Sequence, residues 1–318
     1  MNVQYRPAES PDEVMQSLST TQKAFERTPA DYFRRRLELD PTLNPGDTFL
    51  ALMDGRIACV VQRFPREMYV RGHLVRLTGI GNVGTHPDFR GEGLASGLMR
   101  QVLQTSLQQE FELAMLFTRI PDFFAEFGFR PVERNEFYVM PVPEAPRGEI
   151  GLFSRKTVLA DVMALYETFT PPRTGTVRRS AAYWNGQIDF ARDDPELFYV
   201  LRRQGCLVAY TRGARLGETL RLMEYAYRDS LVDVLQLASH VAREQGCNRL
   251  RLPLTPEELF QTPDPVPIGA DEEDRIMLHI LNPESLTERF SLWDDEPDSI
   301  MENLFGPGEF TFWQTDFF

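Results

Sequence analysis

The feature that most constrains the fold is a glycine loop at residues 90–95, set between a strand pattern and a helix pattern. An apolar run over residues 77–85 ends at this loop, and from Leu94 onward apolar residues repeat at the i, i+4 spacing of one helix face. Gly91 and Gly93 can take backbone angles closed to other residues, so loop N–H groups can turn inward beside the positive end of the helix. This order predicts an anion site that fits a pyrophosphate.

The chain also contains two similar halves. Residues 49–53 and 57–61 are apolar runs joined by a polar, glycine-containing turn, and residues 198–201 and 206–210 repeat this arrangement. Each pair predicts a β-hairpin. A helical pattern precedes each hairpin, and a further strand and helix follow it, so we expect a duplicated fold.

The elements after the loop extend the first motif. The helix pattern is followed by an apolar strand at 113–118 and by residues 123–129, which end in the pair Gly128-Phe129. This series resembles motif A followed by motif B of the GNAT N-acyltransferases. Residues 48–128, with the duplicated half behind them, look like the Eis-type (enhanced intracellular survival) acetyltransferases, which join two GNAT folds.

The resemblance implies an α/β chain with mixed sheets, arranged as tandem GNAT folds. Proline-rich stretches at 140–148 and 262–267 read as extended linkers. We therefore expect an acetyl-CoA-binding GNAT domain at 1–145, a degenerate second GNAT-like domain at 149–262, and a short segment at 263–318 that completes the second domain or the active site. The second half lacks a glycine loop between its strand at 220–227 and its next helix.

The residues that the resemblance assigns to acetyl-CoA lie on the strand end, the loop, the first helical turn and motif B. They are Val83, Thr85, Arg90, Gly91, Gly93, Leu94, Ala95, Ser96 and Phe124. The backbone near Val83 to Thr85 would donate to the thioester carbonyl. Phe124 departs from the family, because many of its members place there a tyrosine that is taken to protonate the departing thiolate.

The catalytic base must come from outside the central strand, because Asn82 and its neighbouring glycines cannot accept a proton from an amine. In Eis-type enzymes the C-terminal carboxylate reaches the active site. Here the aromatic chain end alternates with polar residues from Phe310 and predicts a buried strand. The carboxylate of Phe318, or failing it Asp316, is the expected base; the alternative is a docked tail that only closes the domain.

Other polar and aromatic side chains are predicted to be structural. We expect His86 to be a partly exposed loop residue. Trp184, Trp293 and Trp313 are expected to pack in the interior, as are the thiols of the three cysteines (Cys59, Cys206 and Cys247). Neither the cysteines nor the four dispersed histidines have metal-ligand spacing, so no metal is expected.

Composition excludes several partners. The net charge of −13 argues against nucleic acid and weakly favours a cationic acceptor. No apolar run approaches the roughly 20 residues of a membrane span, and the N-terminus has no signal-peptide core, so a cytoplasmic location is expected. Association into a homo-oligomer is left open.

These observations together predict an acetyl-CoA-dependent N-acetyltransferase that acts on a primary amine of a small molecule or peptide. The rival prediction is a catalytically inactive GNAT-like protein that binds acyl-CoA or a partner without turnover. Phe124 is the feature that favours the rival.

Overall fold

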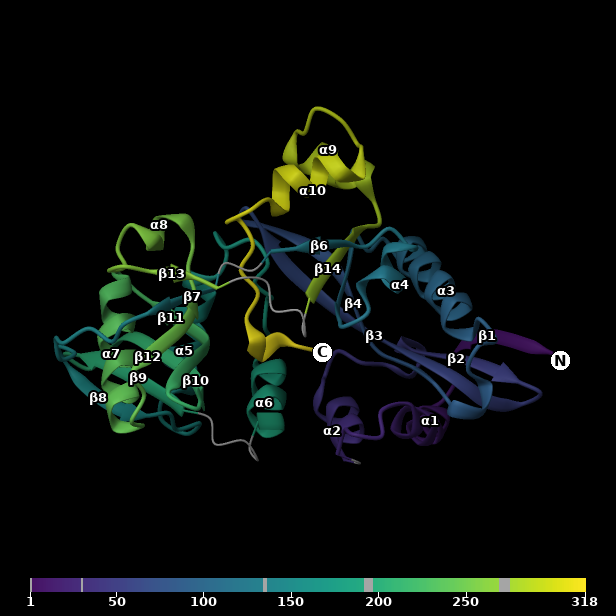
Figure 1. Ribbon diagram of the computed structural model, residues 1–318, viewed down its shortest axis with the longest axis horizontal. Helices are drawn as coiled ribbons and strands as arrows, with labels where there is room; N and C mark the ends of the chain where they lie inside the picture. The colour runs from purple at the N-terminus through teal and green to yellow at the C-terminus, as the bar shows by residue number, and fades with distance from the viewer. Residues whose placement is uncertain (1, 30, 134–135, 192–196, 269–274) are drawn as a thin grey trace.

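The computed structural model describes the chain except for Met1, Ala30 and residues 134–135, 192–196 and 269–274. The described residues form two mixed sheets of seven strands each, one in each lobe of the molecule (Figure 1). In spatial order, the first sheet contains β1 (Val3–Pro7), β2 (Thr48–Met53), β3 (Arg56–Val70), β4 (His73–Thr85), β5 (Leu113–Thr118), β14 (Arg275–Ile280) and β6 (Arg130–Val132). The second contains β13 (Val266–Pro267), β7 (Glu136–Val139), β12 (Arg249–Pro253), β11 (Thr219–Tyr227), β10 (Cys206–Leu216), β9 (Leu197–Arg203) and β8 (Glu149–Leu152).

The helices divide between the two lobes and a small helical cap. Those of the first lobe are α1 (Pro11–Ala24), α2 (Tyr32–Leu39), α3 (Leu94–Gln108) and α4 (Pro121–Ala125). Those of the second lobe are α5 (Leu159–Phe169), α6 (Ala181–Phe190), α7 (Leu231–Glu244) and α8 (Pro256–Leu259). The cap consists of α9 (Pro283–Phe290) and α10 (Pro297–Phe305).

The two sheets have the same internal pattern. Strand pairs are antiparallel except for one central parallel pair in each sheet, β4–β5 in the first and β11–β12 in the second. Both predicted hairpins are present, as β2–β3 and β9–β10. The mixed α/β class and the duplicated fold are confirmed.

The sheets exchange one strand each. β7 follows directly on the first lobe in sequence, yet it pairs with β12 in the second sheet. β14 belongs to the C-terminal segment, yet it lies between β5 and β6 in the first sheet. Sheet boundaries therefore do not coincide with cuts at residues 145 and 262, and the proposed domain division stays a prediction.

The first sheet is covered on both faces, with α3 and α4 on one side and α1 and α2 on the other (Figure 1). Alternate residues of β2 explain this: Phe49 and Ala51 pack in the cluster that contains Leu98 of α3, whereas Leu50 packs with Val14 of α1. Ser10 caps α1 by accepting the N–H of Glu13.

The C-terminal tail runs down between the two lobes and ends at their centre (Figure 1). Residues 310–313 are buried but form no strand, and a 3₁₀ turn, η4 (Gln314–Asp316), follows. The predicted tail strand is therefore wrong. The alternation instead reflects burial toward two lobes, because Phe312 packs in the first and Trp313 in the second.

Two further expectations about packing are corrected. Trp184 and Trp313 are buried as predicted, but Trp293 is fully exposed, in the loop between α9 and α10. Cys59 and Cys247 are buried, whereas Cys206 is exposed at the start of β10, directly after the hairpin turn. None of the three forms a disulfide.

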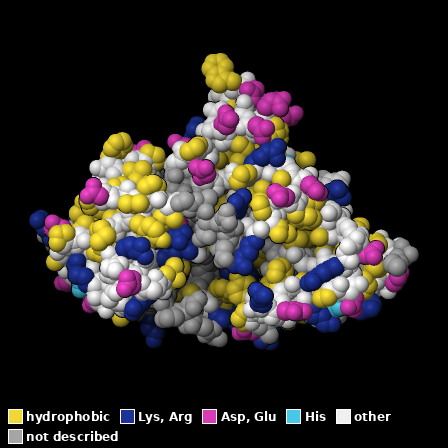
Figure 2. Space-filling model, in the orientation of Figure 1, with side chains coloured by type: hydrophobic (Ala, Val, Ile, Leu, Met, Phe, Trp, Pro, Cys, Tyr) yellow, Lys and Arg dark blue, Asp and Glu magenta, His cyan; other side chains and the backbone are white. Residues whose placement is uncertain are grey.

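The surface charge is uneven. Figure 2 shows acidic side chains over the α9–α10 cap, while Lys and Arg side chains lie along the border between the lobes. No helix among the described residues is long and apolar enough to cross a bilayer. The same part of the chain contains no cluster of three or more His, Cys, Asp or Glu residues able to hold a metal.

Candidate active site

The site begins where β4 and β5 separate. Their parallel pairing runs from Leu77↔Leu113 to Ile80↔Leu116 and ends there, although β4 continues to Thr85. Beyond this point the side of β4 that faced β5 has no strand partner among the described residues. Its backbone groups can therefore meet a ligand.

A bulge in β4 lies at the start of this gap. Between Gly81 and Gly84 the register against β3 shifts, so that Asn82 and Val83 face a single residue of β3. Asn82 has a left-handed backbone with φ of +52°. A bulge bends its strand and leaves one residue outside the ladder. Val83, the predicted carbonyl donor, lies in this bulge.

The glycine loop is open toward the outside. Gly93 precedes α3 with φ of +71°, Gly91 has φ of +86°, and a Cβ built on either would meet no atom within 4 Å. No side chain among the described residues caps the N-terminus of α3. The first N–H groups of the helix are therefore available to an anion, which fits the diphosphate of a coenzyme A ester.

The remaining loop residues anchor this arrangement. Leu94 is buried under the loop, Ala95 and Ser96 are half-buried, and Arg90 is exposed. Arg90 could therefore approach a bound phosphate without breaking a packing contact.

The side chains at the end of β4 are held by their neighbours. The Thr85 hydroxyl donates to the Cys59 thiol at 3.1 Å, so its proton is not available to a ligand in the gap. His86 is 8% exposed, and its Nδ1 accepts the N–H of Asp88 at 3.2 Å, while its Nε2 lies 3.0 Å from Lys23 Nζ. The expected partial exposure of His86 is therefore wrong, because the ring caps the short helix that follows β4.

Phe124 is part of the apolar core. It lies on α4, is 5% exposed, and contacts the rings of Phe123 and Phe129 with centroids 4.9 and 6.2 Å apart. Its cluster also contains Leu94 and Leu98 of α3. The ring thus packs behind the glycine loop and offers no acid group.

The last residue of the tail lies against the central strand of the first sheet. The Phe318 ring packs between Phe64 and Phe117, with centroids 5.5 and 5.1 Å away. A Cβ built on Gly79 would stand 2.7 Å from this ring, and one built on Gly81 would stand 3.3 Å from a C-terminal oxygen. The terminal carboxylate therefore lies beside Gly81, directly before the bulge.

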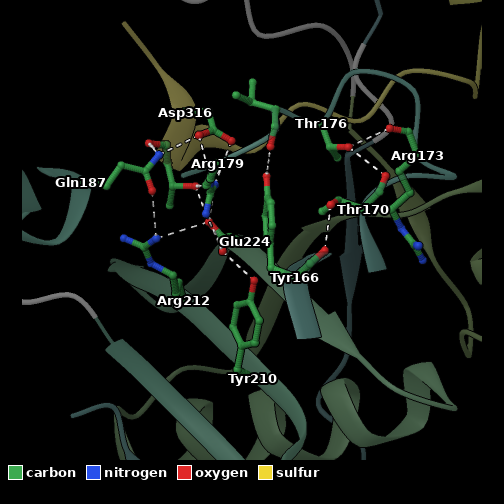
Figure 3. Close-up of polar contacts among 12 residues, drawn as sticks. Tyr166, Thr170, Arg173, Thr176, Arg179, Gln187, Tyr210, Arg212, Glu224 and Asp316 are labelled. Carbon is green, nitrogen blue, oxygen red and sulfur yellow. Dashed lines mark hydrogen bonds and ion pairs between the residues drawn. The ribbon is translucent and has the colours of Figure 1, made fainter. Parts of the chain in front are cut away.

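Asp316 is only two residues away but lies in another environment. It is completely buried, and both of its carboxylate oxygens accept hydrogen bonds from Arg179, at 2.9 and 2.8 Å (Figure 3). Gln187 donates a third bond to Oδ1 at 2.7 Å. Burial raises the pKa of Asp316, against the attraction of Arg179. A carboxylate enclosed in this way is not directed at a substrate.

The second sheet has the corresponding gap but not the anion site. β11 and β12 pair only from Thr219 to Arg221 and then separate. At the helix that follows, the Ser230 hydroxyl accepts the N–H of Val232, and Asp233 adds a negative charge to the first turn of α7. A capped, acidic helix start disfavours a phosphate.

Two hollows lie at the border of the lobes near the tail. One, of about 590 Å³, is lined by residues that include Arg66, Arg178 and Arg179. The other, of about 620 Å³, includes Phe190 and Arg212 in its lining. Neither lining includes Phe318, the glycine loop or the end of β4, so the geometry of these hollows does not select a substrate.

These features together define the class of the first lobe. A mixed sheet with a separated central parallel pair, a bulge and a helix start open to an anion is the arrangement that the GNAT resemblance predicts. Residues 4–132 match the family model described as an acetyltransferase (GNAT) domain. The chain therefore carries a GNAT acetyltransferase domain, followed by a second GNAT fold.

Several solved structures share the two-sheet fold. A probable N-acyltransferase of unknown function from Enterococcus faecalis is 18% identical with a TM-score of 0.71, over 88% of this chain and 73% of that one. Eis1 from Mycobacterium abscessus is 17% identical with a TM-score of 0.68, over 90% and 75%. N-myristoyltransferase from Saccharomyces cerevisiae, solved with bound myristoyl-CoA, is 8% identical with a TM-score of 0.56, over 88% and 79%. No curated protein matches the sequence.

Sequence reasoning missed the polar cluster that holds Asp316. Its members Arg179 and Gln187 lie in a stretch that shows no motif. Glu224 gave a usable signal, because it is a carboxylate within the largely apolar run 220–227 and a buried carboxylate requires a partner.

Proposed function

We propose that the chain is an acetyl-CoA-dependent N-acetyltransferase that acylates a primary amine of a small molecule or peptide, with one coenzyme A site per chain. The observation that carries this proposal is the position of the Phe318 carboxylate. It lies beside Gly81, at the start of the gap between β4 and β5, in the lobe whose glycine loop is open to an anion.

The reaction assigns a role to each part of the site. The amine nitrogen attacks the thioester carbonyl, a C–N bond forms, and the C–S bond breaks. The Phe318 carboxylate accepts the proton that the ammonium group loses before the attack, and the backbone at Val83 to Thr85 donates to the carbonyl oxygen. The second proton, which the nitrogen loses as the amide forms, goes to the coenzyme A thiolate after it has left. Coenzyme A leaves as a thiolate, since Phe124 has no proton to give; an ordinary thiol pKa of about 8.5 makes this tolerable.

A second candidate function is favoured by Phe124. A GNAT fold without a general acid can bind an acyl-CoA or a partner without turning over. This candidate predicts coenzyme A binding with no acceptor-dependent release of thiol.

Two features of the environment complete the proposal. We propose a cytoplasmic location. We also propose, on the basis of the net charge of −13, that nucleic acid is not a partner. The arginines along the lobe border in Figure 2 mean that this charge does not by itself select a cationic acceptor.

The test is thiol release from acetyl-CoA across a panel of primary amines, with the unmodified chain and with a chain extended by a few residues after Phe318. We expect the extension to lower turnover to the small rate that remains without the base, while coenzyme A binding and the melting temperature stay unchanged. Full activity of the extended chain would rule the carboxylate out as base. Binding without thiol release for any amine would favour the second candidate.

A further inference from the structure

The tail connects the two lobes over a very short length. Trp313 is fully buried in the core of the second lobe, where its ring contacts that of Tyr225 with centroids 5.1 Å apart. Phe317 and Phe318 pack instead with Phe117 of the first lobe. Five residues after it enters one core, the chain therefore ends against the other.

Between these anchors the tail is held by a buried ionic cluster of the second lobe (Figure 3). Arg179 donates two bonds to Asp316, two to Glu224 at 3.1 and 2.8 Å, and one to the Thr315 hydroxyl at 2.8 Å. Arg179, Glu224 and Asp316 have no exposed side-chain surface. Gln187 also donates to the Thr315 carbonyl at 2.8 Å, so the tail backbone is fixed as well.

Glu224 is itself placed by the bulge of β11. The register of β11 against β10 passes from Leu222↔Gly213 to Glu224↔Arg212, leaving one residue of β11 extra. Arg212 lies 3.3 Å from the Glu224 carboxylate, and the Tyr210 hydroxyl donates to it at 2.7 Å. The two sheets thus have a bulge at corresponding places, in β4 and in β11. The bulge of β4 contains the predicted carbonyl donor, whereas the bulge of β11 is followed by Glu224, which binds Arg179.

Fold stability alone is a weak reason for such a cluster. A buried ion pair is often no more stabilising than apolar residues of the same volume, because desolvation offsets the attraction. The cluster does, however, fix the position of the tail. A chain advances by at most roughly 3.3–3.6 Å per residue, so fixing Asp316 leaves the carboxylate of Phe318 only about 7 Å of reach.

We propose that Arg179, Glu224 and Asp316 are positioning residues, through which the second GNAT fold holds the C-terminal carboxylate in the active site of the first. This inference rests on the proposed function, since it assigns the carboxylate the role of base. It also gives the second sheet, which lacks an anion site of its own, a task in the reaction.

The experiment is a double-mutant cycle between Asp316→Asn and the extension after Phe318. The amide has the shape of the carboxylate but loses the charge that attracts Arg179. A displacement of about 1 Å can cost on the order of 10²-fold in rate, so we expect a fall in kcat of this size with an unchanged coenzyme A dissociation constant. The doubly changed chain should be no slower than the extended chain, because both changes act through one carboxylate.

A second readout follows the chain end without using activity. Carboxypeptidase A releases C-terminal phenylalanine, and we expect release from the Asp316→Asn chain to be faster than from the unmodified chain. The matched control is Glu136→Gln, which breaks the Arg221–Glu136–Arg251 cluster of the same sheet without touching the tail. It should leave kcat and phenylalanine release unchanged.

The results separate the positioning role of the cluster from the role of the carboxylate as base. Multiplicative losses in the cycle, or unchanged phenylalanine release, would overturn the positioning role. If Asp316→Asn does not fold, Glu224→Gln takes its place in the same cycle. Full activity of the extended chain would overturn the base assignment, whereas the carboxypeptidase result would still report whether the cluster holds the tail. An unmodified chain that releases no thiol with any amine would overturn the proposed function and the positioning role together.

Discussion

Gly93 has a positive φ, and the space around its Cβ position is open. A substitution there can therefore test coenzyme A binding without disturbing the packing of the fold. A Glu side chain at this position would point a carboxylate into the space over the loop, and its charge would oppose a phosphate. We therefore expect Gly93→Glu to abolish coenzyme A binding, measured by calorimetry against one site per unmodified chain.

The control for this change is Gly55→Glu, in the turn of the first hairpin. Gly55 also has a positive φ, of +79°, and open space around its Cβ position. Both variants carry the same backbone strain, so a loss of binding confined to Gly93→Glu must come from the loop. Two equivalent sites per unmodified chain would contradict the interpretation of the second fold as degenerate.

Phe124 takes the position at which the GNAT resemblance predicts a tyrosine acid for the departing thiolate. If its ring edge faces the thioester sulfur, Phe124→Tyr adds an acid and should raise turnover, since a well-placed acid contributes about 10²–10⁴-fold. Coenzyme A affinity should change little. The comparison variant is Phe129→Tyr, whose ring is completely buried, so its hydroxyl would lack a partner and lower the melting temperature without a gain in rate. Equal rates for Phe124→Tyr and the unmodified chain would show that the hydroxyl has no role here.

At the scale of elements, β4 and the tail fit together through glycine. A Cβ on Gly79 would lie 2.7–2.8 Å from three atoms of the Phe318 ring, which is closer than real Cβ contacts. Gly79→Ala should therefore push the ring off the sheet and lower kcat, while coenzyme A affinity is kept. Gly151→Ala in β8 is the matched strand variant, since its nearest neighbour is at 3.7 Å. The kcat of each variant is measured at saturating acetyl-CoA. An unchanged kcat for Gly79→Ala would mean that turnover does not require the Phe318 ring to pack against Gly79.

Elements with local signals could be predicted from the sequence. The apolar run 113–118 coincides with β5, and the i, i+4 pattern that begins at Leu94 coincides with the start of α3, because each pattern depends only on which face of the element is buried. The coenzyme A loop itself remains a prediction, although its glycines have the positive φ that the motif requires.

The exchange of β7 and β14 could not be predicted, because strand pairing between distant segments leaves no local pattern. Gly128 illustrates this. Gly128 belongs to the motif, and its φ is +88°. A Cβ at this position would also lie 2.8 Å from His279 of the exchanged strand, and the sequence gives no sign of that contact. The ionic cluster could not be predicted for the same reason, because Arg179 and Asp316 are 137 residues apart in the sequence.

At the scale of the whole molecule, the ionic cluster links the stability of the two lobes to pH. Burial would raise the pKa of Glu224, but Arg179 and Arg212 outweigh it and lower the pKa to about 2, from the ordinary value of 4.5. A carboxyl with a lowered pKa stabilises the folded chain fully above its unfolded pKa, and that stability is lost as the pH falls toward the folded pKa. By linkage this single group contributes about 3 kcal/mol at neutral pH.

This link can be measured as a difference between variants. Glu224→Gln removes the titrating group, so its melting temperature should lie well below that of the unmodified chain at pH 6, and the gap should narrow steadily toward pH 3. Asp316 contributes with the opposite sign, because burial raises its pKa, and the charge of Glu224 raises that pKa as well. The Asp316 contribution is therefore smaller in Glu224→Gln, so the gap should narrow less steeply than Glu224 alone would give. The control is Tyr210→Phe, which removes a hydrogen bond to Glu224 without removing the charge. Since the pKa of Tyr210 is raised well above 10, its gap from the unmodified chain should stay nearly constant over the same range. A Glu224→Gln gap that does not narrow would mean that the arginines do not hold Glu224 ionised. The electrostatic basis of the ionic cluster that holds the tail would fail with it.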